Sequence, residues 1–439
     1  MNIKFLYKLF LECEGVTTDT RKCGPGLIYF ALKGERFDGN MFALQALELG
    51  CKYAVIDSPE FYESTEERLI KVDNVLKTMQ ELARYHRRAL KTTVIGITGT
   101  NGKTTTKELI SAVMSKAFNI LATEGNLNNS IGVPLTVLKL KPQHQYAIVE
   151  MGASHPGDIK ELVDVCEPDY GIITNVGMAH LLGFGSFEGV ISTKGELYDF
   201  IRARKDGKIF LNADNEYLKK IATGLNSIFY GKPSDNGNLS IVGETVDCDP
   251  YLRFRWKRKD EVDFHKVNTN LIGSYNVDNA LAAVTIGDYF GVSPEKITEA
   301  IESYKPSNNR SQLTETASNR VIADAYNANP TSMMAALENF NIMQSENKTL
   351  ILGDMRELGQ SSEAEHLKVL ETIMKFGFSD VNLVGAEFAK ANEAKGFGFK
   401  HYNTVEDMAE VLKNAPLKDR TILLKGSNGI HLTGLLDLL

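Results

Sequence analysis

A glycine-rich segment that could bind a nucleotide occupies residues 96–106, with the sequence GITGTNGKTTT. It follows an apolar stretch typical of a strand and precedes a helical pattern, which is the order found in phosphate-binding loops. Backbone N–H groups of such a loop can turn toward phosphate oxygens, and the start of the helix adds partial positive charge. Lys103 can reach the β and γ phosphates, and Thr104 can ligate Mg²⁺. Although Ile97 breaks the standard GxxxxGK[ST] spacing, the flanking elements predict an ATP site rather than a chance glycine turn.

Three further residues could act beside that nucleotide. Glu150 ends the apolar run YAIVE and His180 follows a run that ends in TNVG, so both are expected at the carboxyl edge of a sheet, where open α/β folds bind ligands. Mg²⁺ prefers oxygen, so His180 would need other oxygens around it. Taken singly, Glu150 could be a solvated strand end and His180 a loop residue, but next to the phosphate loop they predict a metal site. The spacing of Lys194 alone favours a surface charge near the start of a helix.

The elements that must position these residues predict an α/β protein of three domains. Residues 1–90 mix short strands and helices, and residues 91–305 and 306–439 each alternate strands with helices, which indicates parallel sheets. Helices are expected at 3–11, where apolar residues follow amphipathic spacing, and at 40–49. The strands are expected at 27–32, 52–56, 93–97, 146–152, 170–177, 208–214, 320–326, 349–355, 380–385 and 421–426.

Residues 250–267 have a different pattern, because apolar and basic residues alternate. Leu252, Phe254 and Trp256 are separated by single cations, and a second strand is expected around Val262 and Phe264. Interleaved aromatic and basic residues could bind single-stranded nucleic acid. The period of two in an acidic chain favours a hairpin with one solvated face instead.

Composition and charge narrow the class of protein. The chain has 439 residues, 43% of them hydrophobic and 24% charged, which is typical of an ordinary globular protein. Its 49 basic and 56 acidic residues give a net charge of −7, so no global basic field would hold nucleic acid or an anionic membrane. Five scattered cysteines without CxxC spacing indicate neither a disulfide framework nor a zinc site, and fit a reducing cytoplasm. The apolar runs are too short to predict a membrane span.

The motifs together resemble the Mur ligases of peptidoglycan synthesis along nearly the whole chain. They are TTDTR (17–21), ALKGERFDGNMF (31–42), GTNGKTTTKE (99–108), TEGNLNNSIGVP (123–134), VEMGASHPGDI (149–159), AHLLGFGS (179–186), TKGELY (193–198), DAYNANPTSM (324–333), LGDMRELG (352–359) and LKGS (424–427). GTNGKT is shared with folylpolyglutamate synthetase-like enzymes and does not select the substrate. GNLNNSIGVP, DAYNANP and GDMRELG resemble the branch that adds D-alanyl-D-alanine, and the Asp-Asn-Pro loop of the enzyme that adds the third amino acid is not found.

The resemblance implies an ATP-dependent amide ligase that joins D-alanyl-D-alanine to UDP-N-acetylmuramoyl-tripeptide through an acyl phosphate. It implies a first domain (1–90) that binds the UDP-sugar, a central ATP-binding domain (91–305), and a Rossmann-like third domain (306–439) that closes over ATP and receives the dipeptide. Two Mg²⁺ ions are expected, with Lys194 carbamylated to support the second. We expect a cytoplasmic monomer that binds no nucleic acid.

The resemblance also assigns expected roles to individual residues. The expected metal ligands are Thr104, Glu150, His180 and Lys194, and Lys103, His180 and Lys194 are the expected catalytic residues. The expected nucleotide contacts are Gly99, Thr100, Asn101, Gly102, Lys103, Thr104, Thr105, Asn279, Arg310 and Asp324. The expected substrate contacts are Thr18, Asp19 and Arg21 for the uridine nucleotide, Asn128 and Asn129 for the muramoyl part, and Tyr326, Asn327 and Asn329.

Three positions depart from the family pattern, and three other functions stay open. Tyr275 stands where His is usual and Asn309 where Gly precedes the arginine, which affects adenine packing and the hinge. Asn428 stands where Arg is frequent, which affects a contact with the dipeptide carboxylate. The alternatives are a ligase for another acceptor, a P-loop switch or motor that joins no substrates, and a purely structural protein. The motifs do not distinguish lysine from diaminopimelate as the third residue of the tripeptide.

Overall fold

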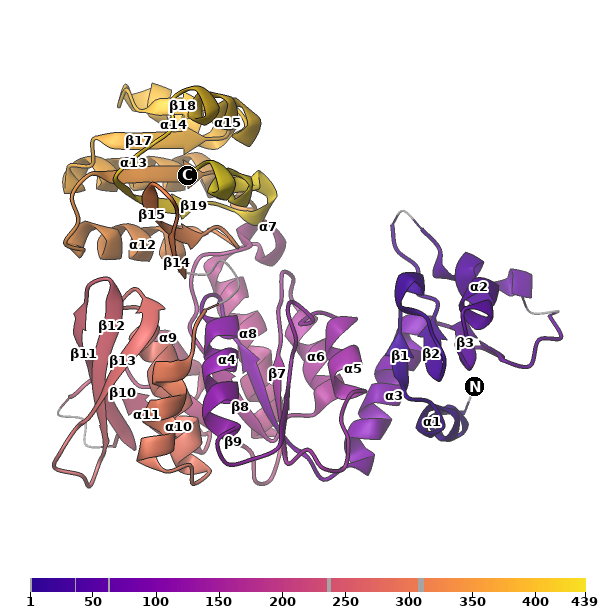
Figure 1. The fold of residues 1–439 in the computed structure, drawn as a ribbon. Coiled ribbons are helices and arrows are strands. Elements are labelled where there is room, and N and C mark those ends of the chain that lie inside the picture. Colours follow the sequence, from indigo (N-terminus) through magenta and orange to yellow (C-terminus); the bar gives the residue numbers. More distant parts are fainter. Residues whose placement is uncertain (1, 36, 62–63, 235–237, 307–311) are drawn as a thin grey trace.

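Three separate sheets follow one another along the chain (Figure 1). The computed structural model describes residues 2–35, 37–61, 64–234, 238–306 and 312–439. In Figure 1 helix α3 (Val75–Ala89) lies between the N-terminal sheet, in indigo, and the central part, while the C-terminal sheet, in orange and yellow, lies above the central one. The arrangement confirms the predicted α/β fold with a parallel central sheet.

The N-terminal sheet has four parallel strands in the order β1-β2-β3-β4. They are β1 (Gly15–Thr17), β2 (Leu27–Phe30), β3 (Tyr53–Ile56) and β4 (Leu69–Lys71). Helix α1 (Ile3–Leu11) contacts α3 and buries Leu6 and Phe10, as its predicted amphipathic spacing requires. The helix expected at 40–49 consists of a 3₁₀ turn, Gly39–Phe42, followed by α2 (Ala43–Glu48).

The central sheet has nine strands in the order β13-β12-β11-β10-β9-β8-β5-β7-β6. All neighbours from β11 to β6 are parallel. The first strands are β5 (Thr93–Thr98), β6 (Ile120–Ala122), β7 (Tyr146–Glu150), β8 (Tyr170–Ile173), β9 (Lys208–Asn212) and β10 (Ser227–Gly231). The helices are α4 (Lys103–Met114), α5 (Gly132–Val137), α6 (Asp158–Cys166), α7 (Leu181–Phe184), α8 (Phe187–Arg202), α9 (Glu216–Ile221), α10 (Asn276–Tyr289) and α11 (Pro294–Ser303). The strands expected at 146–152, 170–177 and 208–214 end earlier than predicted, at Glu150, Ile173 and Asn212, where the chain turns into the loops at the carboxyl edge of the sheet.

The predicted hairpin is part of a longer antiparallel extension of the central sheet. Strands β11 (Ile241–Cys248), β12 (Tyr251–Arg258) and β13 (His265–Ile272) pair in sequence, and β12 buries Leu252, Phe254 and Trp256 as expected. The second strand expected around Val262 and Phe264 is wrong: it begins at His265, and Val262 is 88% exposed in the charged turn. Strand β13 is hard to predict because five of the eight residues of HKVNTNLI are polar.

The C-terminal sheet has six strands in the order β14-β15-β19-β16-β17-β18, parallel except for β14. The strands are β14 (Gln312–Glu315), β15 (Asn319–Asp324), β16 (Lys348–Gly353), β17 (Asp380–Val384), β18 (Lys400–Tyr402) and β19 (Arg420–Lys425). The helices are α12 (Pro330–Ile342), α13 (Ser362–Phe376), α14 (Ala386–Lys395) and α15 (Val405–Asn414). Strand β19 lies between β15 and β16, so the carboxyl ends of β15 and β19 lie side by side.

None of the described helices combines the length and the apolar composition that crossing a membrane would need.

Candidate active site

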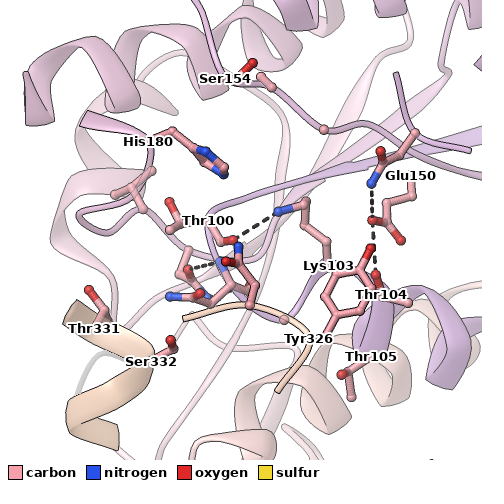
Figure 2. A pocket seen from close by; sticks show the side chains of 18 of the residues that line it. Thr100, Lys103, Thr104, Thr105, Glu150, Ser154, His180, Tyr326, Thr331 and Ser332 are labelled. Carbon is pink, nitrogen blue, oxygen red and sulfur yellow. Dashed lines mark hydrogen bonds between the residues drawn. The ribbon is translucent and has the colours of Figure 1, made fainter. Parts of the chain in front are cut away.

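A cavity of about 810 Å³ lies where the carboxyl ends of central strands meet the C-terminal domain (Figure 2). The central sheet contributes the loops after β5, β7 and β8, and the C-terminal domain contributes the loop after β15, the start of α12 and the end of β19. Residues expected from the sequence line it: Thr100, Asn101, Gly102, Lys103, Thr104, Thr105, Asn128, Asn129, Glu150, His180, Asn279, Asp324, Tyr326 and Asn327.

The phosphate loop joins β5 to α4 and depends on its glycines. Gly102 precedes the helix with φ of +76°, and a Cβ there would lie 2.4 Å from Asn279 Oδ1. Gly99 has φ of +147°, and a Cβ there would lie 2.0 Å from Thr174 Oγ1. Lys103 donates from Nζ to the backbone oxygens of Gly99 at 2.8 Å and Thr100 at 3.0 Å. The ammonium therefore lies against the backbone of the loop. The loop takes this conformation because residues 99 and 102 are glycines, which have no side chain to clash.

Substituting alanine for Gly102 should weaken nucleotide binding by on the order of 10-fold, because the loop must move to relieve both the positive φ and the contact with Asn279. Titration calorimetry with ADP measures this loss. Gly224→Ala is the matched control, since Gly224 has a similar φ of +81° but nothing within 4 Å of the added Cβ. Equal ADP affinity in Gly102→Ala and the unmodified chain would contradict the prediction.

Glu150, at the end of β7, carries a buried carboxylate with one unused oxygen. Its side chain is 1% exposed, and Oε1 accepts hydrogen bonds from Thr104 Oγ1 at 3.1 Å and Asn128 Nδ2 at 2.8 Å (Figure 2). Among the described residues, Oε2 has no hydrogen-bond partner. A buried carboxylate oxygen without a partner is costly. The two oxygens of Glu150 and Thr104 are hard donors of the kind that bind Mg²⁺.

His180 faces the C-terminal domain. It precedes α7 with φ of +51°, and its Nδ1 contacts Glu357 Oε2, a residue that itself has φ of +65°. Leu182 N also donates to the backbone oxygen of Glu357 at 3.3 Å. Burial lowers the pKa of His180, opposed by the Glu357 carboxylate. Figure 2 shows Lys103 between His180 and Glu150, so the two expected metal ligands line different parts of one cavity.

Lys194 lies inside the fold, so its interpretation as a surface charge is wrong. It sits in α8 with 2% exposure, and its Nζ lies 3.5 Å from the backbone oxygen of Ala153 and 5.3 Å from the centroid of the Phe184 ring. Burial, and secondarily Lys103, lowers the pKa of Lys194 to about 7. Within the described residues it forms no ion pair with a carboxylate. The missed signal is the spacing of Val190, Lys194, Leu197, Tyr198 and Ile201, which places the lysine on the apolar stripe of the helix.

The C-terminal wall contacts the phosphate loop directly. Asn329 Nδ2 donates to Asn101 Oδ1 at 2.8 Å, and Asn329 also begins α12 with a capping box. Asp324 ends β15, and its Oδ2 accepts from Lys425 Nζ at 2.6 Å. Sequence reasoning missed Lys425, although this lysine ends the apolar strand TILLK as Glu150 ends YAIVE. The rule that a charged residue at the carboxyl end of an apolar strand marks a site could have found Lys425 as well.

Other expected residues lie outside the cavity or outside the described part. Thr18, Asp19 and Arg21 follow β1 in the N-terminal domain, where Arg21 donates to Asp19 at 2.8 Å. Tyr275 lines the cavity at the start of α10, and Asn428 is exposed after β19. Arg310 and Asn309 fall outside the described residues.

Comparison with known proteins places this geometry in a family. Sequence models of the Mur ligases match three stretches: the catalytic domain of the family at residues 12–87, the middle domain at 97–287 and the glutamate ligase domain at 309–428. The UDP-N-acetylmuramoyl-tripeptide–D-alanyl-D-alanine ligase of Bacillus subtilis is 35% identical over 427 residues, which cover 95% of this chain and 91% of that protein. The chain belongs to the Mur ligase family. The enzyme of the same name from Escherichia coli is also 35% identical, over 423 residues and the same shares of both chains.

Solved structures have the same fold as this Mur ligase. MurF from Acinetobacter baumannii superposes with a TM-score of 0.87 at 29% identity, covering 100% of this chain and 98% of that one. MurF ligase from Thermotoga maritima, solved in complex with ADP, superposes with a TM-score of 0.85 at 24% identity, covering 98% and 97%. The resemblance inferred from the motifs is therefore confirmed, and the chain is a ligase of this family.

Proposed function

We propose that this Mur ligase uses ATP to join D-alanyl-D-alanine to UDP-N-acetylmuramoyl-tripeptide, as the names of its relatives in Bacillus subtilis and Escherichia coli describe for them. The observation that carries the proposal is the phosphate loop with Lys103, set beside the buried Glu150 in a cavity that a second domain completes. We assign the UDP-sugar to residues 1–90, ATP to 91–305, and domain closure with dipeptide binding to 306–439.

The reaction needs a carboxylate oxygen converted into a leaving group. The terminal carboxylate of the tripeptide attacks the γ phosphorus of ATP, the bond to ADP breaks, and an acyl phosphate forms. The neutral amine of the dipeptide then attacks the carbonyl carbon, phosphate leaves, and the amine proton passes to solvent or phosphate. Lys103 stabilises charge on the transferring group, and positioning accounts for most of the remaining catalysis. Closure of the C-terminal domain excludes the water that would hydrolyse the acyl phosphate.

Thr104 and Glu150 fit a Mg²⁺ ion in this scheme. Together they offer one buried carboxylate and one hydroxyl, and among the described residues no cluster of three acidic, histidine or cysteine side chains adds to them. Mg²⁺ in phosphoryl-transfer sites is commonly held by one or two carboxylates, with phosphate oxygens and water completing the octahedron. When bound, the ion would neutralise charge on the phosphates. His180 and Lys194 are our candidates for a second ion.

We propose that Lys194 is carbamylated, since an ammonium would repel that second ion. Its neutral amine adds to CO₂, which gives a carbamate and releases one proton, and burial already disfavours the charged ammonium. The product would be an anionic oxygen ligand on α8, next to Ala153, which lines the cavity.

Incubation with ¹³C-bicarbonate should therefore give a carbamate signal in ¹³C NMR. The signal should grow as the pH rises through about 7, because the lowered pKa of Lys194 makes its amine neutral above that value. Lys194→Ala should abolish the signal and lower the rate of phosphate release by on the order of 10²-fold. Lys205→Ala, an exposed lysine beyond the same helix, is the control. A carbamate signal that persists in Lys194→Ala would assign the modification elsewhere.

We assign the remaining contacts from their positions. Asn128 hydrogen-bonds Glu150 and with Asn129 lines the side of the cavity where the muramoyl part would enter. The adenosine part is assigned to Asn279 and Asp324, and the dipeptide to Tyr326, Asn327 and Asn329. Thr18, Asp19 and Arg21 would meet the uridine nucleotide. We also propose a cytoplasmic monomer, which fits five free cysteines.

Release of phosphate tests the whole proposal. It should require the UDP-linked tripeptide and D-alanyl-D-alanine together, measured with lysine- and diaminopimelate-containing tripeptides. Preference for another acceptor amine would indicate a different ligase of the family. Rapid ATP hydrolysis without an acceptor would indicate a switch or motor instead.

A further inference from the structure

An ion pair between a buried lysine and a partly exposed aspartate joins the ends of two neighbouring strands in the C-terminal sheet. Lys425 and Asp324 are the last residues of β19 and β15 and lie side by side in parallel register. The Lys425 ammonium donates to Asp324 Oδ2 at 2.6 Å and to the backbone oxygen of Asn327 at 3.3 Å. Lys425 is 1% exposed, and both charged residues line the cavity that contains the phosphate loop. The pair therefore belongs to the wall that the C-terminal domain gives to this cavity.

Stability alone does not account for a lysine at this position. Removing a charged pair from water costs free energy that the attraction between the charges often fails to return, and apolar residues of similar size stabilise a fold as well or better. The preceding residues of β19, Ile422, Leu423 and Leu424, are all buried and apolar. An apolar residue at position 425 would continue the same pattern. The position of the ammonium is therefore explained by the site and not by the core.

The second contact of Lys425 extends its effect to the phosphate loop. Asn327 lies in the segment 324–329, which leaves β15 and enters α12. At the end of this segment, the side chain of Asn329 donates to that of Asn101 in the phosphate loop. The ammonium thus holds the beginning and the middle of a segment whose end contacts the central domain.

We propose that Lys425 is a positioning residue of the nucleotide site: it fixes the Asp324 carboxylate and the segment 324–329 where they complete the cavity against the phosphate loop. It acts chiefly through Asp324, because its ammonium is held by that carboxylate at 2.6 Å and more loosely by the Asn327 oxygen at 3.3 Å. The inference rests on the proposed use of ATP. It adds that nucleotide affinity depends on a buried cation in the C-terminal domain, far along the sequence from the phosphate loop.

A double-mutant cycle on nucleotide affinity tests the inference, with ADP and magnesium as the probe and titration calorimetry as the readout. Lys425→Met should raise the Kd for ADP by on the order of 10-fold, because the Asp324 carboxylate loses its partner and turns away. Asp324→Asn should also raise it. The double variant should bind little more weakly than Asp324→Asn alone, because Lys425 acts through that carboxylate. The KM for the UDP-linked substrate should stay unchanged.

Two further variants separate positioning from folding. Lys348→Met is the control: Lys348 begins the neighbouring strand β16 at the opposite edge of the sheet and donates to the backbone oxygen of Asn341 at 2.9 Å, so its loss should leave the Kd unchanged. Lys425→Arg keeps the charge and should give an intermediate Kd, and it replaces the methionine variant in the cycle if that variant does not fold. A purely structural role of Lys425 would lower the melting temperature without changing the ratio of the KM for ATP to the KM for the UDP-linked substrate.

Losses of affinity that add in the double variant, or an unchanged Kd in Lys425→Met, would overturn the inference. An Asp324→Asn variant with unchanged Kd would overturn it too, by removing the group through which Lys425 acts. Failure of the proposed function is recognised separately, because it concerns phosphate release by the unmodified chain and not its affinity for ADP.

Discussion

Replacing Lys103 with methionine is expected to lower kcat for phosphate release by about 10³-fold, because a phosphoryl group that carries several negative charges loses the ammonium of the phosphate loop. Methionine keeps most of the length of the side chain. The ammonium donates to the backbone oxygens of Gly99 and Thr100, so it also holds the loop in shape. Steady-state kinetics with a coupled phosphate assay gives kcat, and calorimetry with ADP gives the affinity.

The control for Lys103→Met is Lys116→Met. Lys116 lies just beyond the other end of α4 and pairs with Glu299 on the surface at 2.8 Å, so its removal changes the net charge equally without touching the cavity. Thermal unfolding of both variants separates a loss of catalysis from a loss of fold. A kcat within a few-fold of the unmodified chain in Lys103→Met would exclude this lysine from phosphoryl transfer.

Glu150→Gln is expected to move activity and stability in opposite directions. Glutamine keeps an oxygen that can accept from Thr104 and Asn128, but removes the negative charge from a side chain with 1% exposure and a partnerless Oε2. Activity should fall by about 10²- to 10³-fold because the oxygen donors for Mg²⁺ are weakened. The melting temperature in the absence of ligands should stay the same or rise, because an uncompensated buried charge is removed.

Circular dichroism for unfolding and the phosphate assay for activity check both halves of this expectation. Glu124→Gln is the matched control, since Glu124 is exposed and pairs with Lys139 at 2.6 Å. A large drop in melting temperature in Glu150→Gln would indicate that the carboxylate serves the fold and not a metal.

Local sequence rules predicted the parts of the site that one strand and its following loop determine. The phosphate loop follows one apolar strand and Glu150 ends another, and the carboxyl ends of both strands meet at one sheet edge, so their positions follow from periodicity and strand direction. The burial of Lys194 was equally local but was misread, because a lysine was assigned by its type and not by its place on the helical stripe. Strand β13 was missed because its polar residues hide the alternation.

Contacts across the domain junction could not be predicted in this way. His180 and Glu357 are separated by 177 positions, and each has a backbone conformation unusual for its residue type. Asn101 and Asn329 meet only because two sheets, each with its own core, lie with their strand ends facing one another. The relative position of two separate cores cannot be predicted from the hydrophobic pattern or from the spacing of motifs.

The walls of the cavity come from the central sheet and the C-terminal sheet. The width of the cavity therefore depends on the distance between these two sheets and not on the packing of either core alone. Away from the cavity, Cys248 Sγ donates to Asn339 Oδ1 at 3.4 Å and Gln344 N donates to Asp249 Oδ1 at 3.3 Å across the same junction. A ligand that fits only one separation of the two sheets would stabilise that arrangement over any other. An inhibitor of this enzyme therefore need not resemble ATP. A compound that binds between the two sheets and holds them further apart would suffice.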